Sequence, residues 1–414
     1  MKRIVIVFLG LLGLSIFSTS CKKGGGDTGQ LIGVQDRPTW KGINPYGMIY
    51  VPQGTLNIGS DDQDLRNTYL SRAKAISIQG FYMDDTEISN NEYRQFVQWV
   101  IDSLAHTALE DFIENEDGTQ SIDWEVEIDW TNESLADMYF QGNDVLDGKQ
   151  EIDITKLKYQ YDWFDTKSAA YDRGKTVRSS FVKKKETTVY PDTMVWTRDF
   201  AYSYNEPMTR NYFWHPAYDD YPVVGVNWVQ ASAFCHWRNK MWNTYRPDER
   251  HTEGFRLPTE FEWEYAARGG RNQTPFPWGG YSLRNGKGCL LANFKPGRGN
   301  YPEDGGQFTV KVDSYFPNDY GLYNMSGNVS EWTSSAYVEN AYSFIHDLNP
   351  DIKYDAKEGD PESFKRKVIR GGSWKDIGYF LRNGVRHFEY QDTAKSYIGF
   401  RCVLSFMGRA PSDN

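Results

Sequence analysis

Cysteines are the residues of this chain whose chemistry depends most on spacing. A thiolate can bind a soft metal such as copper, act as a nucleophile or form a disulfide. The 414 residues contain four cysteines: Cys21, Cys235, Cys289 and Cys402. No cysteine lies between Cys289 and Cys402, so the segment RGGSWKDIGYFLRNGVRHFEYQDTAKSYIGFRC at 370–402 holds only its terminal thiol. This segment cannot hold copper between two thiolates of its own.

Carboxylates and one serine are the other groups that could do chemistry. Asp84, Asp85 and Glu87 lie close together, and such a cluster could supply a general acid and a general base. We favour turn or metal-shell roles for them, because grouped carboxylates on a loop more often serve those purposes. Ser373 would need a neighbouring base, and the sequence names none. The six histidines form no close pair, which disfavours a histidine-bound iron or zinc centre. We therefore predict no catalytic residue.

The start of the chain has the composition of an export signal. Lys2 and Arg3 precede an apolar run at 4–17, and three small residues at 18–20 come directly before Cys21. This order is typical of a lipoprotein leader, so we predict that residues 1–20 are removed and that Cys21 is lipidated. The alternative is a plain secreted protein with a stray cysteine at that position.

A tether is predicted behind the lipid anchor. Residues 21–44 open with two lysines and the flexible GGGD at 24–27, which is typical of a linker. No later run reaches the roughly eighteen apolar residues needed to span a membrane, so the lipid on Cys21 should be the attachment. The formal net charge is −10, and loss of the two basic leader residues makes it more negative. Because nucleic acid is itself an anion, we predict no nucleic-acid partner.

Hydrophobic spacing predicts short strands and one clear helix in the first part of the body. Residues 48–51 and 54–59 have the pattern of two strands about a turn. Ser89 and Glu92 form a capping-box sequence ahead of an apolar stripe with three- and four-residue spacing that runs to Leu104. This stripe is typical of one buried helix face.

Two further helices are predicted downstream. One follows Asn227, and the other begins at Thr259, with Glu262 as its capping partner, and ends at Gly269. After Gly270 the chain is rich in glycine, proline, asparagine and aromatic residues, which favours long ordered loops. Such loops need aromatic packing, a disulfide or metal ions to hold them.

A long stretch at about 102–206 separates the first helix from the second. One hundred residues are too many for a structureless loop inside a domain, so we expect a subdomain or an arm ordered by a partner. Aromatic residues alternate with charges there, as at partner interfaces. We expect that residues 105–195 can be deleted without unfolding the rest of a domain at 45–408. Residues 409–414 should form a tail.

Six sequence blocks resemble those of the formylglycine-generating enzymes, or sulfatase-modifying factors. In order, they are FYMDDTEISNNEYRQF at 81–96, YPVVGVNWVQASAFCHW at 221–237, FRLPTEFEWEYAARGG at 255–270, GLYNMSGNVSEW at 321–332, RGGSW at 370–374 and GFRC at 399–402. The resemblance spans most of residues 45–405. It implies an α+β, loop-rich fold with short strands and a few helices, carrying here a large insertion.

The resemblance also implies two calcium ions that pin the loops. The implied ligands are Asn324, Gly327, Val329 and Glu331 for one ion and Asn293, Phe294, Asp304 and Gly306 for the other. Glycine, valine and phenylalanine would contribute backbone carbonyls, and a mixture of carboxylate, amide and carbonyl oxygens suits Ca²⁺. A calcium-free reading, in which Asn324 and Glu331 cap turns, leaves a buried Glu331 that would be costly without a partner.

The cysteines of the family have counterparts here only in part. The resemblance places a disulfide between Cys235 and Cys402, joining the second helix to the last strand. The enzymes hold copper between two cysteines after RGGSW, but Asp376 stands at the first of these positions and IGYFLRN at 377–383 contains no cysteine. A carboxylate cannot replace a thiolate on copper, so we expect no copper and no oxidase activity.

Segments outside the six blocks resemble the gliding-motility lipoproteins of the type IX secretion system. They are GQLIGVQDRPTWKGINPYGMIYVPQG at 29–54, DWFDTKSAAYDRG at 162–174 and the stretch from VYPDTM to PVVGV at 189–226. This resemblance implies a lipid-anchored protein on the periplasmic face of the outer membrane. It would form a homo-oligomeric ring with GldN (PorN) and work with other type IX secretion proteins in protein secretion and, in some species, gliding.

Three alternatives stay open. The paralogous motility lipoprotein GldJ shares the fold, although YPDTMVWTRDFAYSYNEP at 190–207 favours the ring-forming branch. An oxidase with an unorthodox centre would bind copper or consume oxygen with a cysteine peptide. A binding module would hold a glycan or peptide on its loops as a monomer.

Overall fold

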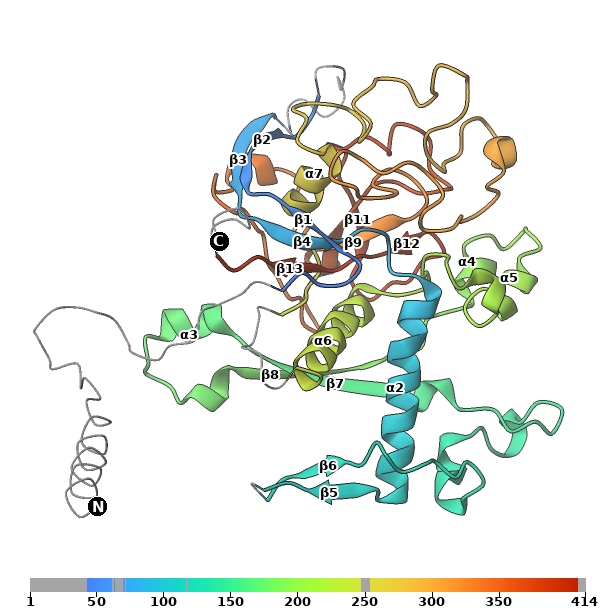
Figure 1. Ribbon diagram of the computed structural model, residues 1–414. Coiled ribbons are helices and arrows are strands. Elements are labelled where there is room, and N and C mark those ends of the chain that lie inside the picture. The colour runs from blue at the N-terminus through green and yellow to red at the C-terminus, as the bar shows by residue number, and fades with distance from the viewer. Residues whose placement is uncertain are drawn as a thin grey trace, which may run out of the picture. The chain divides into compact units, whose positions relative to one another are not determined.

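The structure is a computed structural model. It describes residues 43–61, 63, 70, 72–116, 118–246 and 254–408, with the side chain of Asp304 left out. Short strands and a few helices are joined by long loops throughout this part of the chain, so the predicted α+β, loop-rich class is confirmed. Figure 1 shows the small sheets and α7 in the upper part of the view, the hairpins β5–β6 and β7–β8 in the lower part, and α4 and α5 to the right of the upper end of α2.

Two small sheets bring the beginning and the end of the domain together. The first has the order β1 (Met48–Val51), β4 (Phe81–Asp84), β13 (Val403–Ser405), all antiparallel. The second has the order β11 (His387–Tyr390), β10 (Arg366–Arg370), β9 (Ser330–Ala336), β12 (Ile398–Gly399), with β12 parallel to β9. The predicted second strand is β2 (Gly54–Ile58), and it pairs with β3 (Lys74–Ile78). The segment 370–402 therefore begins at the end of β10, supplies β11 and β12 to the second sheet, and ends just before β13 of the first.

All three predicted helices form, and each begins with a complete capping box. The helices are α2 (Asn90–Leu109), α6 (Trp228–Thr244) and α7 (Glu260–Arg268). In α2 the Ser89 side chain accepts from the Glu92 amide, and the Glu92 carboxylate accepts from the Ser89 amide at 2.8 Å. These bonds satisfy amides that a helix start leaves unpaired. Gly269, with φ 58°, ends α7.

The insertion is built from two hairpins, short helices and turns. Because α2 continues to Leu109, the insertion begins later than predicted. Its strands and longer helices are β5 (Phe112–Glu114), β6 (Gln120–Ile122), β7 (Lys158–Phe164), α3 (Thr166–Asp172), β8 (Val182–Thr188), α4 (Val195–Arg198) and, just after it, α5 (Glu206–Asn211). Short 3₁₀ turns complete the described chain at 133–138, 142–144, 154–156, 178–181, 216–218, 302–304, 341–343 and 362–365.

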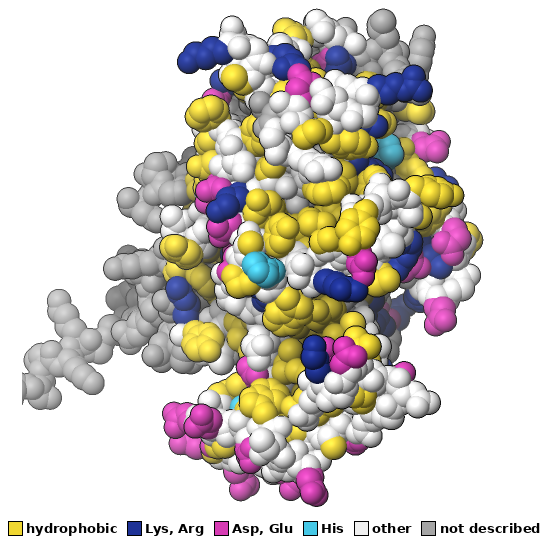
Figure 2. Space-filling view, turned by 90° about the vertical axis from the view of Figure 1, so that its right-hand side faces the viewer, with side chains coloured by type: hydrophobic (Ala, Val, Ile, Leu, Met, Phe, Trp, Pro, Cys, Tyr) yellow, Lys and Arg dark blue, Asp and Glu magenta, His cyan; other side chains and the backbone are white. Residues whose placement is uncertain are grey.

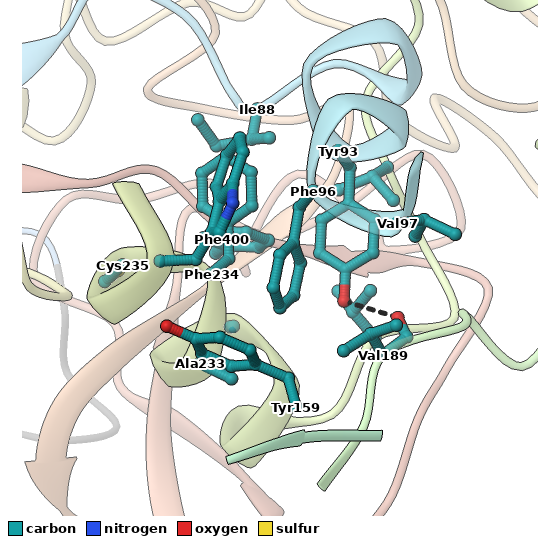
Figure 3. Close-up of a cluster of buried hydrophobic side chains, with 14 of the residues drawn as sticks. Ile88, Tyr93, Phe96, Val97, Tyr159, Val189, Ala233, Phe234, Cys235 and Phe400 are labelled. Atoms are coloured by element: carbon teal, nitrogen blue, oxygen red, sulfur yellow. Dashed lines mark hydrogen bonds between the residues drawn. The ribbon is translucent and has the colours of Figure 1, made fainter. Parts of the chain in front are cut away.

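Part of the insertion belongs to the main hydrophobic core. Figure 3 shows Tyr159 and Val189 beside Tyr93 and Phe96 of α2 and Phe234 of α6. The rings of Phe96 and Tyr159 meet edge to face with centroids 5.3 Å apart, and the Tyr93 hydroxyl donates to the Val189 carbonyl at 2.9 Å. The expectation that residues 105–195 can be deleted harmlessly is therefore wrong, since deletion would open this core.

Helices of the described chain are too short or too polar to cross a bilayer. The proposed leader, Cys21, almost all of the tether at 21–44 and the tail at 409–414 lie outside the described residues. These four predictions therefore stay predictions.

Candidate functional site

The segment 370–402 encloses a small cavity at the place where the resemblance put a copper centre. The cavity has a volume of about 120 Å³ and lies between β10, β11 and the loop after RGGSW. Its polar lining comprises Ser330, Arg370, Lys375, Asp376, His387, Glu389 and Tyr397. None of the residues that line it is a cysteine. The cavity has one imidazole, that of His387, and no thiolate pair of the kind that selects Cu(I).

Asp376 fills its position through hydrogen bonds rather than as a free ligand. The Ser373 hydroxyl donates to its carboxylate at 2.5 Å, and the Lys295 amide donates to its backbone carbonyl at 2.9 Å. The Lys375 ammonium lies 3.2 Å from the centre of the Tyr397 ring, and burial lowers the pKa of Lys375. Burial likewise lowers the pKa of His387. The Ser373 hydroxyl is therefore hydrogen-bonded to the Asp376 carboxylate itself, and no histidine stands between the two as the base of a nucleophilic serine would.

The first proposed calcium set surrounds two buried carboxylates. Glu331 accepts from the Arg401 guanidinium at 2.8 and 2.7 Å and from the Trp263 indole at 2.7 Å. The expectation that Glu331 would lack a partner without calcium is therefore wrong, because the Arg401 guanidinium neutralises the Glu331 carboxylate. Asn324, the second side chain of the set, donates to Glu87 at 3.1 Å and to the Val312 carbonyl at 2.8 Å.

Glu87 is the residue that sequence reasoning undervalued. It is fully buried, and its carboxylate accepts only amide donors, from Asn324 at 3.1 Å and Asn328 at 3.0 Å, among the described residues. Burial raises the pKa of Glu87 to about 8, although Arg401 pulls it down. Arg401 is hydrogen-bonded to Glu331 and not to Glu87, so Glu87 is mainly protonated at neutral pH unless a cation lies beside it. A bound cation such as Ca²⁺ would favour its ionised form. The block FYMDDTEISN carried this signal, but only the fold shows that Glu87 faces inward.

The second proposed calcium set is also brought together in space. Asn293 is buried, and its amide nitrogen donates to the Phe308 carbonyl at 2.8 Å. That bond leaves the amide oxygen facing Gly306, where a Cβ atom would lie 2.8 Å from it. The Asn293 amide oxygen therefore lies beside the Gly306 backbone, and amide and carbonyl oxygens are donors that a hard cation takes. Phe294 follows directly in the chain, and the Asp304 side chain lies outside the described part.

The two cysteines of the predicted disulfide lie side by side. Cys235 of α6 and Cys402, next to β13, are both buried, and their sulfur atoms are 3.4 Å apart. The structure has them as free thiols. Burial, together with the hydrogen bond between Cys402 and Cys235, raises the pKa of the Cys402 thiol. A covalent bond between them stays a prediction, for which this contact supplies the proximity.

A family model described as the "Sulfatase-modifying factor enzyme 1-like domain" matches residues 37–406. The chain belongs to this family. The formylglycine-generating enzyme of Mus musculus is 28% identical over 369 residues, which cover 88% of this chain and 76% of that protein. The inactive C-alpha-formylglycine-generating enzyme 2 of Bos taurus is 34% identical over 200 residues, covering 47% of this chain and 53% of that protein. The family therefore contains members named as enzymes and members named as inactive.

Solved structures of the family's fold cover a similar part of the chain. PvdO from Pseudomonas aeruginosa aligns with a TM-score of 0.48 and 18% identity, covering 87% of this chain and 94% of that one.

Proposed function

We propose that the chain is a non-catalytic member of its family that serves as GldK, or PorK, an outer-membrane lipoprotein of the type IX secretion system. One observation carries the non-catalytic part. No cysteine lies between Cys289 and Cys402, and the cavity enclosed by residues 370–402 is lined by Asp376 and other hard donors instead. Copper(I) oxidation chemistry needs soft thiolate ligands, which this cavity does not offer.

The assignment to the secretion system is supported by the segments outside the six blocks. Residues 29–54, 162–174 and 189–226 resemble the gliding-motility lipoproteins. They include β7 and α3 of the insertion and the α4–α5 region. In this proposal the lipid on Cys21 holds the protein to the periplasmic face of the outer membrane. The folded body forms a homo-oligomeric ring with GldN or PorN and supports secretion, and gliding where the organism glides.

Calcium and a disulfide have structural roles in this proposal. One Ca²⁺ takes Asn324, Glu331 and two backbone carbonyls beside Glu87, and another takes Asn293 and its neighbours. The bond between Cys235 and Cys402 ties α6 to the last strand. In this proposal all of these groups stabilise loops, and none of them reacts with a substrate.

The end of the insertion and the α4–α5 region are the proposed contact surface. Tyr202, Tyr204, Met194 and Trp214 leave large apolar side chains exposed there, with Tyr204 84% exposed. Figure 2 shows hydrophobic side chains spread over the middle of the face on which α4 and α5 lie, and acidic ones gathered below. Exposed aromatic groups among charges are typical of partner interfaces. A stable contact there would bury on the order of 1,000 Å² or more.

Co-purification tests this assignment. The full-length lipoprotein should be extracted with detergent together with the GldN-type partner and appear as rings by electron microscopy. The double variant Tyr202→Ser, Tyr204→Ser should lose most of the partner, while the matched control Phe316→Ser, Tyr281→Ser, which also removes exposed rings, should retain it. Particles that stay monomeric and partner-free in the native envelope would refute the ring assignment. Recovery of a different motility partner would favour GldJ instead.

An activity assay tests the non-catalytic part separately. Purified protein loaded with Cu(I) should leave a cysteine-containing sulfatase peptide unchanged by mass spectrometry in the presence of oxygen. Conversion of the cysteine to an aldehyde would overturn the non-catalytic reading, whatever the ring assay gives.

A further inference from the structure

A second and larger cavity lies away from the segment 370–402 loop, between the insertion and the core. Its volume is about 480 Å³, within the range of small-molecule sites. The hairpin β7–β8, helix α6, strand β10 and the loop at 353–355 enclose it. The side chains that line it include Tyr161, Trp163, Lys185, Trp228, Phe255 and Lys367.

Lys367 places a buried ammonium group in the wall of this cavity. The residue is 1% exposed, and its Nζ donates to the Tyr354 carbonyl at 2.5 Å. The same Nζ lies 3.8 Å from the centre of the Trp228 ring. One carbonyl and one ring face satisfy only part of an ammonium that can donate three hydrogen bonds. Burial also lowers the pKa of Lys367 to about 8, although the carboxylates of Asp355 and Asp351 act in the opposite direction.

The other cations around the cavity each have a carboxylate partner. Lys185 lies 3.5 Å from Asp355, Lys353 lies 3.3 Å from Asp351, and Arg256 forms a two-pronged pair with Glu262 at 2.7 Å. Lys367 has no carboxylate within ion-pair distance among the described residues. The cavity wall therefore has one ammonium group that no carboxylate contacts directly, and a single anionic group would be a suitable partner for it.

The rest of the wall is aromatic. The Tyr161 ring stacks on the His236 ring with centroids 4.4 Å apart, and Trp163 continues the same side. Phe255 and Trp228 line the cavity too, and the wall as a whole is mainly apolar. Flat aromatic faces favour a planar or branched apolar group.

We propose that this cavity binds an apolar, preferably aromatic, group that ends in one carboxylate, with the carboxylate on Lys367 and the apolar part against Trp163 and Phe255. A carboxylate supplies the single negative charge that Lys367 lacks. A phosphate dianion would bring a second charge that the paired cations cannot take up, and an organic cation would be repelled. The ligand could be a free acid or the C-terminal residue of a polypeptide, because both present the same group.

Calorimetric titration of the full-length protein in detergent tests the proposal. The probe 4-phenylbutyrate should bind at one site with a dissociation constant on the order of 0.1 to 1 mM, as expected for twelve non-hydrogen atoms. The neutral 4-phenylbutyramide, which has the same shape, should bind at least about tenfold more weakly. A second arm compares N-acetyl-Gly-Phe with its C-terminal amide. If N-acetyl-Gly-Phe binds more tightly than 4-phenylbutyrate, the natural ligand is the C-terminal residue of a polypeptide. If 4-phenylbutyrate binds more tightly, the natural ligand is a small acid.

Variants assign the binding to this cavity. Lys367→Met should weaken both acids about tenfold or more while leaving the thermal midpoint unchanged or higher, because it removes a buried charge. Lys365→Met is the matched control, since that lysine lies two residues away and bonds Glu362 instead, and it should leave binding unchanged. Ser232→Leu should block the cavity without touching Lys367. The proposal is overturned if neither acid binds, if acid and amide bind alike, or if Lys367→Met and Ser232→Leu both bind like the wild type.

Discussion

Acidification should weaken the packing of the insertion on α6 through His236. The His236 ring stacks on Tyr161 of β7, and burial lowers its pKa to about 4, although Asp162 acts in the opposite direction. A histidine whose folded pKa is depressed is neutral in the native state but protonates in the unfolded state below about pH 6.5. The stability of the fold that depends on a neutral His236 is therefore fully present above pH 6.5 and is lost as the pH falls from 6.5 to about 4.

The expected size follows from these two pKa values. At pH 5 the unfolded state is protonated and the folded state is not, which favours unfolding by about 2 kcal/mol relative to pH 7.5. This is an upper value, because the ring keeps some solvent exposure and water screens its charge. His236→Phe keeps a ring against Tyr161 but cannot take up a proton.

Urea unfolding at pH 7.5 and at pH 5 measures the effect. Other groups titrate in both proteins, so the quantity of interest is the change in unfolding free energy of the wild type minus that of His236→Phe. We expect the wild type to lose about 1 to 2 kcal/mol more than the variant on acidification. Equal losses in the two proteins would show that His236 is not held in its neutral form, and the reasoning would fail.

Two further predictions concern the elements that hold the loops. Chelation by EGTA should lower the thermal midpoint, and 1 mM calcium should restore it, with a stabilisation of about 3 kcal/mol if the ion is present at 100 times its dissociation constant. Glu331→Gln should reduce this response to calcium. An unchanged midpoint in the wild type would argue against a bound calcium ion. A reducing agent should destabilise the oxidised wild type by about 2 to 4 kcal/mol but leave Cys235→Ala unaffected. Identical behaviour of the two would mean that Cys235 and Cys402 are not bonded.

The sequence predicted best those features that depend on neighbours along the chain. The capping boxes at Ser89 and Thr259 predicted two helix starts, because each box closes within three residues, and the third helix was placed correctly after Asn227. The six blocks predicted the family for the same reason, since each is a continuous run.

Features assembled from distant segments could not be predicted in this way. Arg401 meets Glu331 across 70 residues, so the sequence treated Glu331 as a lone carboxylate. Lys367 lies in β10, whose sequence shows no unusual pattern. Its ammonium group becomes enclosed only because the hairpin β7–β8 and Trp228 pack around it in the fold. The insertion has the charged composition of a surface arm, yet alternate residues of β7, such as Tyr159 and Tyr161, are buried in the core.

Arginine–glutamate pairs hold the segment 370–402 in place by contacts that do not involve Asp376. The segment 370–402 contributes three buried arginines, and each meets a fully buried glutamate of α7 or β9. The pairs are Arg370 with Glu264, Arg386 with Glu260 at 2.7 Å, and Arg401 with Glu331 at 2.7 Å. Removing one partner of such a pair typically costs about 3 to 5 kcal/mol, because it strands a buried charge.

None of these six residues stands at a position where the enzymes of the family carry copper-binding cysteines. The framework of the segment is therefore separate from the groups that would react, and Asp376 is tied only to Ser373 and a backbone amide. Replacing a thiolate at such a position changes the chemistry of the cavity but breaks no buried ion pair. A chain that has no cysteines there can keep the loops, the sheets and the outer surfaces on which assembly into a ring would depend.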